Sequence, residues 1–459
     1  MHRRLFLKSA ALAGAGVGLG HLPGVAYSEF FGTAAALPDY RALVCVFLFG
    51  GNDSYNMVVP RSQAEYDVYA RSRQNLAVPR DQLLPITALN PDGAQYGFHP
   101  AMTGIQQLFA AGTCAVVANV GPLVQPVTRT AYLNGSVPLP PQLFSHNDQQ
   151  DQWHALKGEA TLKSGWGGRI ADALMAPGAP TPLDQSLAVN LSLSGQTLFQ
   201  AGVTSVPYTM GPTGPVPLFG LDGADPLSLA RRAAFDAVVG ANYPTIYERA
   251  YAGMQRRARQ SAGLIGEALA GVRSPNPVPF TTAFPASPLG TQLRTVAEMI
   301  AARDALAVNR QIFFVATGGF DTHDAQLADQ PGLLGNMSRC LAAFHRATVE
   351  MGIASSVATF TQSDFGRTLT SNGDGTDHAW GGNQLVIGGA VAGRTIYGRY
   401  PLLQIDGPED VGGGRMIPSV SCDQFAATLA RWFGVPDAQL PVVAPHLGNF
   451  TQQDLGFFA

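Results

Sequence analysis

The stretch from Ile353 to Asn383 reads IASSVATFTQSDFGRTLTSNGDGTDHAWGGN and joins an apolar run to a polar, glycine-rich segment. The apolar run, residues 353–360, has the length of a buried strand. Charged and imidazole side chains follow it directly: Asp364, Arg367, Asp374, Asp377 and His378. Ligands of open α/β sheets bind beyond the carboxyl ends of strands, where carboxylates and imidazoles hold divalent cations. The stretch therefore predicts a strand that ends in a cation site, although a surface loop of turn-forming residues has a similar composition.

Two further segments have the same design. The apolar runs 42–49 and 311–317 are typical of buried parallel strands. The first is followed by Gly50-Gly51-Asn52-Asp53, and the second leads through two glycines to Asp321-Thr322-His323. Carboxylates gathered at one edge of a sheet repel one another unless cations, such as paired divalent ions about 4 Å apart, neutralise them. The expected metal ligands are Asp53, Asp321, His323, Asp364, Asp377 and His378.

The remainder of the chain alternates strands with helices, which predicts a mostly parallel sheet with helices on both faces. Further strands are expected over 114–120 and 384–387, with a hairpin near 191–198. Residues 188–288, with Gly- and Pro-rich ends, are interpreted as an insertion that covers or flanks the site. Helices are expected over 98–112, 226–239, 244–269, 292–306, 333–351 and 422–433.

Three residues are candidates for catalysis: Ser145, His146 and Arg367. Ser145 is a natural helix N-cap, and Asp148 three residues later completes an acidic variant of the capping box. A hydroxyl at a helix N-terminus also lies where an anion is stabilised, so the capping and nucleophilic roles are compatible. His146 is the alternative functional residue at this helix start. Arg367 could form a salt bridge with the acids or hold an oxyanion, and beside a metal site the oxyanion role is favoured.

Composition limits the classes of protein that the chain can represent. Its 459 residues are 46% hydrophobic and 13% charged, with a formal net charge of −3, which is ordinary for a globular protein. No basic face of the kind used to bind nucleic acid is present, so no nucleic-acid partner is expected. The four cysteines form no CxxC pair, and Cys45 and Cys114 are expected to be buried free thiols.

The N-terminus has the features of an export signal. The twin arginine Arg3-Arg4 precedes an apolar, Ala- and Gly-rich run over residues 10–20. The run is too short and too rich in glycine for a membrane span. The pattern is typical of export through the twin-arginine translocase. We expect a signal peptide over residues 1–36, delivery to the periplasm and no integral membrane span.

Several motifs together resemble an uncharacterised family of twin-arginine-exported bacterial proteins allied to the alkaline phosphatase and sulfatase superfamily. They are RRLFLK, FLFGGNDSYN, FSHNDQQDQW, GGFDTH and SDFGRT followed by GDGTDHAWGG. The resemblance implies a three-layer α/β/α sandwich over residues 37–459, alkaline-phosphatase-like, with one or two divalent ions. It implies that Asp53, Asp321, His323 and His378 are metal ligands and that Ser145 is the nucleophile.

The chain departs from the superfamily pattern at Phe365. The Asp-His-Gly element of the superfamily falls on Asp364-Phe365-Gly366, so a phenylalanine stands where a ligating histidine is expected. A site without that nitrogen is expected to favour Mg²⁺ or Ca²⁺ over Zn²⁺, or to be empty.

Three functions are compatible with these features. The leading one is a periplasmic metal-dependent hydrolase of phosphate or sulfate esters, acting on a small anionic ester or on a sulfated or phosphorylated glycan. The second is a degenerate, non-catalytic member that binds an anionic glycan or another envelope component, which Phe365 favours. The third is a serine esterase, because Gly50-Gly51-Asn52-Asp53 resembles an esterase block. However, the chain opens with no Gly-Asp-Ser element, and the spacing of Asp321 and His323 does not fit an esterase.

Overall fold

The computed structural model describes residues 39–90, 93–157, 164–175, 189–216, 218, 220–221, 223–273 and 279–458. The expected signal peptide, residues 1–36, lies outside these ranges. Within them, every helix is too short or too polar to cross a membrane.

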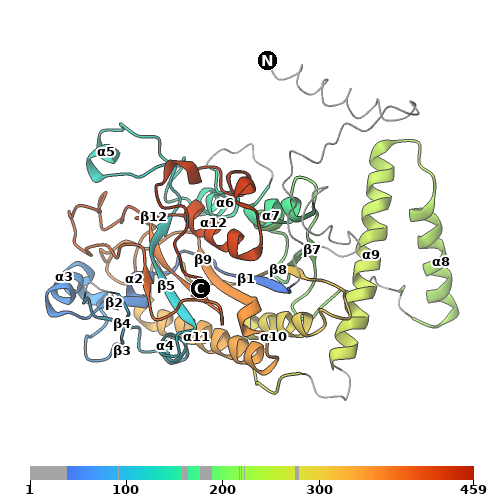
Figure 1. Ribbon diagram of the computed structural model, residues 1–459, viewed down its shortest axis with the longest axis horizontal. Helices are drawn as coiled ribbons and strands as arrows, with labels where there is room; N and C mark the ends of the chain where they lie inside the picture. The colour runs from blue at the N-terminus through green and yellow to red at the C-terminus, as the bar shows by residue number, and fades with distance from the viewer. Residues whose placement is uncertain are drawn as a thin grey trace.

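A sheet lies at the centre of the molecule, and within the described ranges it has nine strands (Figure 1). Their order is β11-β5-β10-β9-β1-β8-β6-β7, and β12 pairs with β5. Only β10 runs antiparallel to its neighbours, β5 and β9, so the prediction of a large, mostly parallel sheet is confirmed. The strands are β1 (Arg41–Leu48), β5 (Cys114–Gly121), β6 (Asn190–Ser192), β7 (Tyr208–Thr209), β8 (Arg310–Thr317), β9 (Val357–Ser363), β10 (Gly382–Ile387), β11 (Ile396–Tyr397) and β12 (Val420–Ser421).

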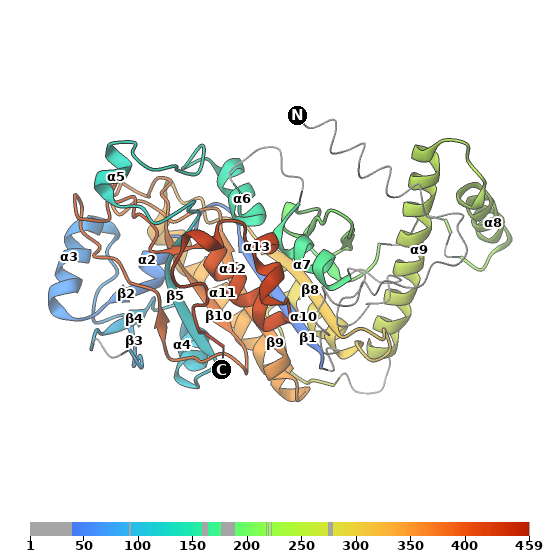
Figure 2. The same cartoon turned by 45° about the horizontal axis from the view of Figure 1, so that its top comes forward.

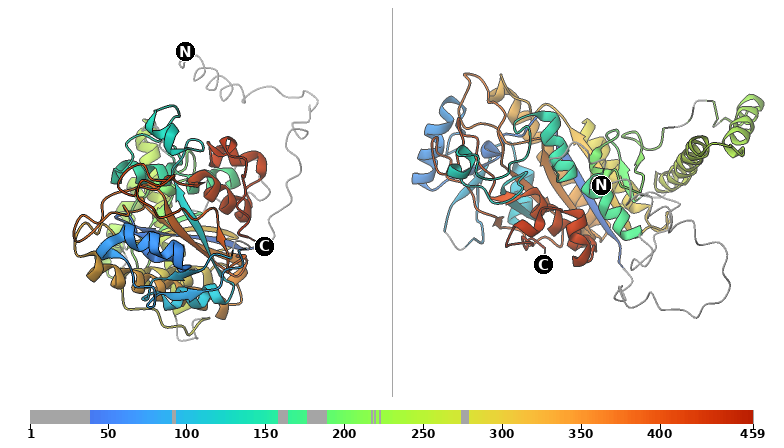
Figure 3. Two further views of the ribbon diagram at one scale, coloured as in Figure 1. Left: turned by 90° about the vertical axis from the view of Figure 1, so that its left-hand side faces the viewer. Right: turned by 90° about the horizontal axis from the view of Figure 1, so that it is seen from above.

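Helices cover both faces of this sheet (Figures 2 and 3). Side chains of β1 alternate between two cores: Val44 and Val46 belong to one, and Cys45 and Phe47 to the other. The first core includes residues of α4 (Thr103–Ala110), α10 (Pro288–Ala301) and α11 (Gln326–Glu350). The second includes residues of α6 (His146–Ala155), α7 (Trp166–Met175), α12 (Cys422–Phe433) and α13 (Leu440–Val443). Because both faces of the sheet are buried, the sequences of β1 and β8 are continuous apolar runs.

A smaller sheet lies beside the end of β1. Strand β4 (Tyr96–Phe98) pairs with both β2 (Val58–Pro60) and β3 (Leu84–Ile86). The neighbouring helices are α2 (Ser54–Met57) and α3 (Gln63–Arg73), and α5 (Arg129–Leu133) lies further along the chain. Short 3₁₀ turns cover Gln74–Leu76, Leu198–Gln200, Ala354–Ser356, Asp437–Gln439 and Leu447–Asn449.

The middle of the chain differs from the expectation of a hairpin near 191–198. Strand β6 is parallel to both β8 and β7, and a 3₁₀ turn occupies Leu198–Gln200. The hairpin prediction was wrong because β6 runs parallel to both of its partners, β7 and β8, whereas the two strands of a hairpin are antiparallel. Helices α8 (Pro226–Gly240) and α9 (Ile246–Arg273) then extend from this end of the sheet (Figure 1). The boundaries of an insertion at about 188–288 stay a prediction.

Other expected elements are present with shifted ends. The helix expected from Phe98 starts at Thr103, because Phe98 belongs to β4. Helix α11 starts at Gln326, earlier than expected, and holds Pro331 in its second turn. All four cysteines are buried and free, which confirms the prediction for Cys45 and Cys114.

Candidate metal centre

The register of three parallel strands brings the acidic loops together. Leu48 at the end of β1 is opposite Thr317 of β8 and Ser363 of β9. The loops that carry Asp53, Asp321 and Asp364 therefore leave the sheet at one edge. They also contact each other closely, since a Cβ on Gly50 would lie 2.3 Å from the backbone nitrogen of Asp321. Gly50 has a φ of +115°, and only glycine accepts both the conformation and the contact.

Three imidazoles surround the carboxylate of Asp321. The Nε2 atoms of His323 and His378 lie 3.1 and 3.3 Å from Asp321 Oδ1. The Nε2 atom of His146 lies 3.3 Å from Asp321 Oδ2. The His323 and His378 Nε2 atoms are 2.8 Å apart. One ligand atom each from His146, Asp321 and His378 fits within 4.8 Å, which makes these residues a possible metal-binding group.

The far nitrogen of each imidazole contacts an acceptor. His146 Nδ1 lies 2.6 Å from Asp364 Oδ2, and His323 Nδ1 lies 3.2 Å from Asp377 Oδ1. His378 Nδ1 lies 2.8 Å from the carbonyl oxygen of Phe144. Carboxylates and carbonyls only accept hydrogen bonds, so each Nδ1 carries its proton there. In a neutral imidazole the Nε2 atom is then left with a lone pair.

A proton or a metal ion between the Nε2 atoms would stabilise this arrangement. Two lone pairs 2.8 Å apart repel each other unless a proton or a metal ion lies between them. Histidines that bind metals have their second nitrogen on a carboxylate or a carbonyl in the same way. Ligand atoms of a tetrahedral ion with bonds of about 2.0–2.1 Å are about 3.3 Å apart, and the contacts to Asp321 span 3.1–3.3 Å. The contacts to Asp321 therefore fit the spacing of ligands around one metal ion, and the Nε2 atoms of His323 and His378, 2.8 Å apart, would have to separate slightly to bind it.

The surroundings of His378 and Asp321 favour a neutral imidazole and an ionised carboxylate at these two positions. Burial lowers the pKa of His378, and the contact with the Phe144 carbonyl offsets only part of this effect. Burial alone would raise the pKa of Asp321, but the hydrogen bond and the charge of Arg367 outweigh it, so the pKa is lowered. The side chains of Asp321 and His323 are 44% and 43% exposed, so the cluster is open to solvent on one side.

Asp364 and Asp377 contact the Nδ1 atoms of His146 and His323, on the side of each ring away from Asp321. They therefore fix the orientation of these two imidazoles. Asp364 is fully buried, and its Oδ2 also accepts a hydrogen bond of 2.8 Å from Gln150 Nε2. Sequence reasoning missed Gln150 and the carbonyl of Phe144. The spacing of His146 and Gln150, four residues apart on α6, is a signal that could have indicated one shared partner for both.

Arg367 has a different role from the expected oxyanion contact. Its Nη1 donates to Asp321 Oδ1 at 2.7 Å and to the Gly50 carbonyl at 3.2 Å. The Nε and Nη2 atoms donate to the side chain and the carbonyl of Thr376. The guanidinium is fully buried, and all three of its nitrogens have acceptors within the protein. Arg367 therefore forms the salt bridge, and it orients Asp321.

Phe365 fills a space beside the imidazoles. Its ring centroid is 4.8 Å from that of His146 and 4.5 Å from that of His378. A Cβ on Gly51 would lie 2.3 Å from the Phe365 ring, so the ring has no room to move toward β1. The imidazole of His146 lies between Asp364 and Asp321, so a ring nitrogen is present next to Asp364 although Phe365 provides none.

Asp53 has partners other than the imidazoles. Its Oδ2 is ion-paired with Arg73 Nη2 and accepts a hydrogen bond of 2.5 Å from Gln326 Nε2. Both side chains of the Asp53–Arg73 pair are buried. Arg73 from α3 therefore neutralises Asp53, and the role of Asp53 as a metal ligand stays a prediction.

Ser145 precedes the first residue of α6, as expected for its N-cap, but its hydroxyl makes no capping contact with the backbone. Its Oγ instead donates to Asp148 Oδ2 at 2.6 Å. The capping-box expectation was therefore wrong, because Ser145 Oγ accepts no hydrogen bond from a backbone N–H of α6 and instead donates to the carboxylate of Asp148. Ser145 lies between Phe144 and His146, which both contact the cluster.

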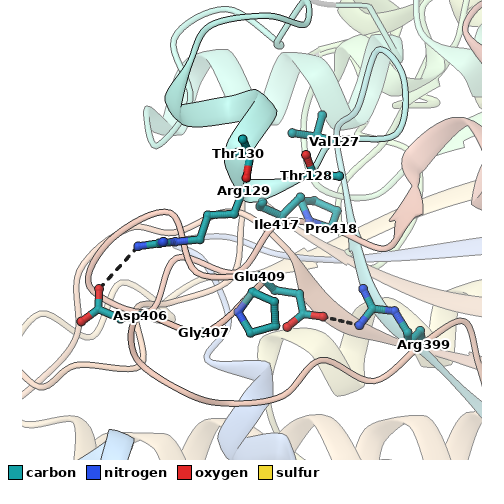
Figure 4. Close-up of a pocket in the computed structure, with 11 residues that line it drawn as sticks. Val127, Thr128, Arg129, Thr130, Arg399, Asp406, Gly407, Glu409, Ile417 and Pro418 are labelled. Atoms are coloured by element: carbon teal, nitrogen blue, oxygen red, sulfur yellow. Dashed lines mark hydrogen bonds and ion pairs between the residues drawn. The ribbon is translucent and has the colours of Figure 1, made fainter.

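A separate cavity of about 520 Å³ lies beside α5 (Figure 4). Its charged side chains are paired with each other, Arg129 with Asp406 and Arg399 with Glu409. None of the candidate site residues lines this cavity. It is therefore distinct from the candidate metal centre.

Residues 231–450 match the family described as "Protein of unknown function (DUF1501)". The matched part contains Asp321 and His378, whereas Asp53 and His146 precede it. The chain has no match among the curated proteins.

Three similar solved structures show low sequence identity. Ps i-CgsB in complex with k-i-k-neocarrahexaose is 11% identical with a TM-score of 0.33, covering 87% of this chain and 74% of that chain. A 2-O GAG sulfatase is 9% identical with a TM-score of 0.29, covering 89% and 75%. A protein of the core genetic locus for glycosaminoglycan metabolism in Bacteroides thetaiotaomicron is 9% identical with a TM-score of 0.32, covering 87% and 74%. At such identities the similarity assigns no role to any residue of this chain.

Proposed function

We propose that the protein is a metal-dependent hydrolase of phosphate or sulfate esters. One observation carries the proposal: three Nε2 atoms surround the Asp321 carboxylate, and two of them lie 2.8 Å apart. The residues that would hold the ion are His146, Asp321, His323 and His378. A bound divalent ion would supply positive charge for the ester oxygens and would lower the pKa of nearby water.

The protein residues hold and orient this centre. Asp364, Asp377 and the Phe144 carbonyl fix the histidine tautomers, and Arg367 fixes Asp321. A cationic centre open to solvent suits an anionic substrate, either a small ester or a sulfated or phosphorylated glycan. The nitrogen of His146 beside Asp364 favours the hydrolase over a degenerate binding protein, the alternative that Phe365 favours.

Ser145 is the proposed nucleophile, and the structure offers it a proton acceptor. Its Oγ would attack the phosphorus or sulfur atom, its proton would pass to Asp148, and the bond to the ester oxygen would break, so that the alkoxide leaves and takes up a proton from water. Water would then hydrolyse the covalent ester of Ser145 in a second step. A serine esterase would instead need a histidine on the hydroxyl, and the hydroxyl donates to Asp148.

Asp148→Asn is expected to lower kcat for an aryl phosphate or aryl sulfate by about 10²-fold, the effect of losing a general base. Ser145→Ala is expected to abolish turnover, because the nucleophilic oxygen is lost. Both variants should keep the metal content of the wild type. The exposed Ser136, which lies on the surface near α5, provides a matched control as Ser136→Ala. Full activity of Ser145→Ala would exclude the serine from the mechanism.

We also propose export to the periplasm by the twin-arginine route. Replacing Arg3 and Arg4 with lysine keeps the charge but removes the arginine pair that the translocase recognises. The expected result is unprocessed precursor in the cytoplasm, measured by cell fractionation. Unchanged delivery to the periplasm would contradict the proposal.

A further inference from the structure

The three acids at the strand ends each have a resident partner within the protein. Asp321 pairs with Arg367, and Asp364 contacts His146 and Gln150. Asp53 pairs with Arg73. Two buried guanidinium groups therefore already offset two of the three carboxylates. With Asp377, which contacts His323, two carboxylates are left without a guanidinium, and one divalent ion among neutral imidazoles would balance them. A second divalent ion would leave a partly buried excess of positive charge.

All three guanidinium nitrogens of Arg73 donate hydrogen bonds, and these bonds hold the side chain in this position. Nη1 donates to the Thr368 carbonyl at 2.7 Å, and Nε donates to Asn56 Oδ1 at 3.1 Å. Nη2 donates to Asp53, and the side chain is fully buried. Moving Arg73 aside for an ion would break all of these hydrogen bonds and leave a buried guanidinium without its acceptors, which is costly in the interior.

The oxygens near Asp53 do not make a hard-cation site by themselves. Asp53 Oδ1 and Asn52 Oδ1 are buried without a hydrogen-bond partner. Asp53 Oδ2, however, is already taken by Arg73 and Gln326. Ca²⁺ needs six to eight oxygen ligands and Mg²⁺ needs a regular octahedron. Two oxygens beside a guanidinium do not provide either.

We propose that the chain binds one divalent transition-metal ion, and that Arg73 is a permanent organic cation in the place of a second ion. The inference rests on the proposed metal centre and defines its stoichiometry and metal class. Three imidazole nitrogens and one carboxylate suit Zn²⁺ or a similar borderline ion, and Mg²⁺ and Ca²⁺ prefer oxygen. This replaces the expectation, drawn from Phe365, of a harder site.

The test is metal stoichiometry, measured by elemental analysis. The mature protein would be stripped with a chelator, incubated separately with Zn²⁺, Mg²⁺ and Ca²⁺, and passed through a desalting column. The expected result is one Zn²⁺ per chain and no retained Mg²⁺ or Ca²⁺. Two Zn²⁺ per chain, or retention of Mg²⁺ or Ca²⁺ instead of Zn²⁺, would overturn the inference while the proposed hydrolase would stand. No retained ion of any kind would overturn both.

Two variants distinguish the role of Arg73 from the role of the metal ligands. Arg73→Gln should admit a second ion beside Asp53, and a folded Arg73→Gln protein with one ion would refute the role of Arg73. The double variant Asp53→Asn with Arg73→Gln removes both charges, so it leaves no buried charge unpaired. It should still bind one Zn²⁺ with an affinity within about threefold of the wild type. Loss of that ion in a protein that circular dichroism shows to be folded would make Asp53 a ligand and overturn the inference.

Discussion

His378→Gln is expected to remove the bound ion and to lower kcat/KM for an aryl phosphate or sulfate by about 10³-fold or more. A metal supplies several kcal/mol of charge stabilisation in the transition state, and each 1.36 kcal/mol is about a tenfold change in rate. Glutamine can replace the contact of His378 Nδ1 with the Phe144 carbonyl, but it does not place a nitrogen next to His323 Nε2. The expected loss of the ion and of activity would therefore result from the missing ligand atom.

The measurements are metal content by elemental analysis and kcat/KM with the same ester. His345→Gln is a suitable control, because His345 is a buried histidine of α11 outside the cluster. It should retain both the ion and the activity of the wild type. A His378→Gln protein with a full complement of metal would contradict the assignment of His378 as a ligand.

Asp53→Ala is expected to lower the free energy of unfolding by about 3–5 kcal/mol, the typical cost of breaking a buried ion pair. The side chains of Asp53 and Arg73 are 1% and 0% exposed, so water does not replace the lost partner. Gln326 Nε2 loses its acceptor in the same substitution. The double variant with Arg73→Met should recover part of the loss, because the charge on Arg73 is then absent as well.

Urea denaturation of the mature protein measures this effect. The ion pair of Asp236 and Arg259 on α8 and α9 provides a control, because its side chains are 55% and 30% exposed. Asp236→Ala should cost about 0–1 kcal/mol, as is usual for surface pairs. An effect of Asp53→Ala no larger than that of the control would show that the buried pair contributes little to stability.

The fold was predictable where local signals agree with the tertiary structure. Continuous apolar runs identify β1, β8 and β9, and the glycines after them mark the loops that reach the centre. The failure at residues 191–198 has a different cause. One partner of β6 is β8, more than a hundred residues later in the chain, and a turn signal carries no information about such a partner.

The site was predictable in part for the same reason. The sequence showed that Asp321, His323 and His378 lie near strand ends, and the structure brings them together. It did not show that His146 reaches the same carboxylate, because that depends on how α6 packs across the sheet. Arg73 gives no local signal either. It lies in a polar helix, and its burial follows from the contact of α3 with the loop after β1.

Strand β9 ties the chemistry of the centre to the packing of the core. Phe360 belongs to the core with α12, and Asp364 follows the same strand four residues later. Side chains of a strand alternate between its two faces, so a slip of one residue moves every side chain to the other face. An insertion or deletion within Val357–Ser363 would therefore turn Asp364 away from His146, even if the strand paired again with β1. The register of β9 in the sheet therefore also determines the contact of Asp364 that positions the proton on His146.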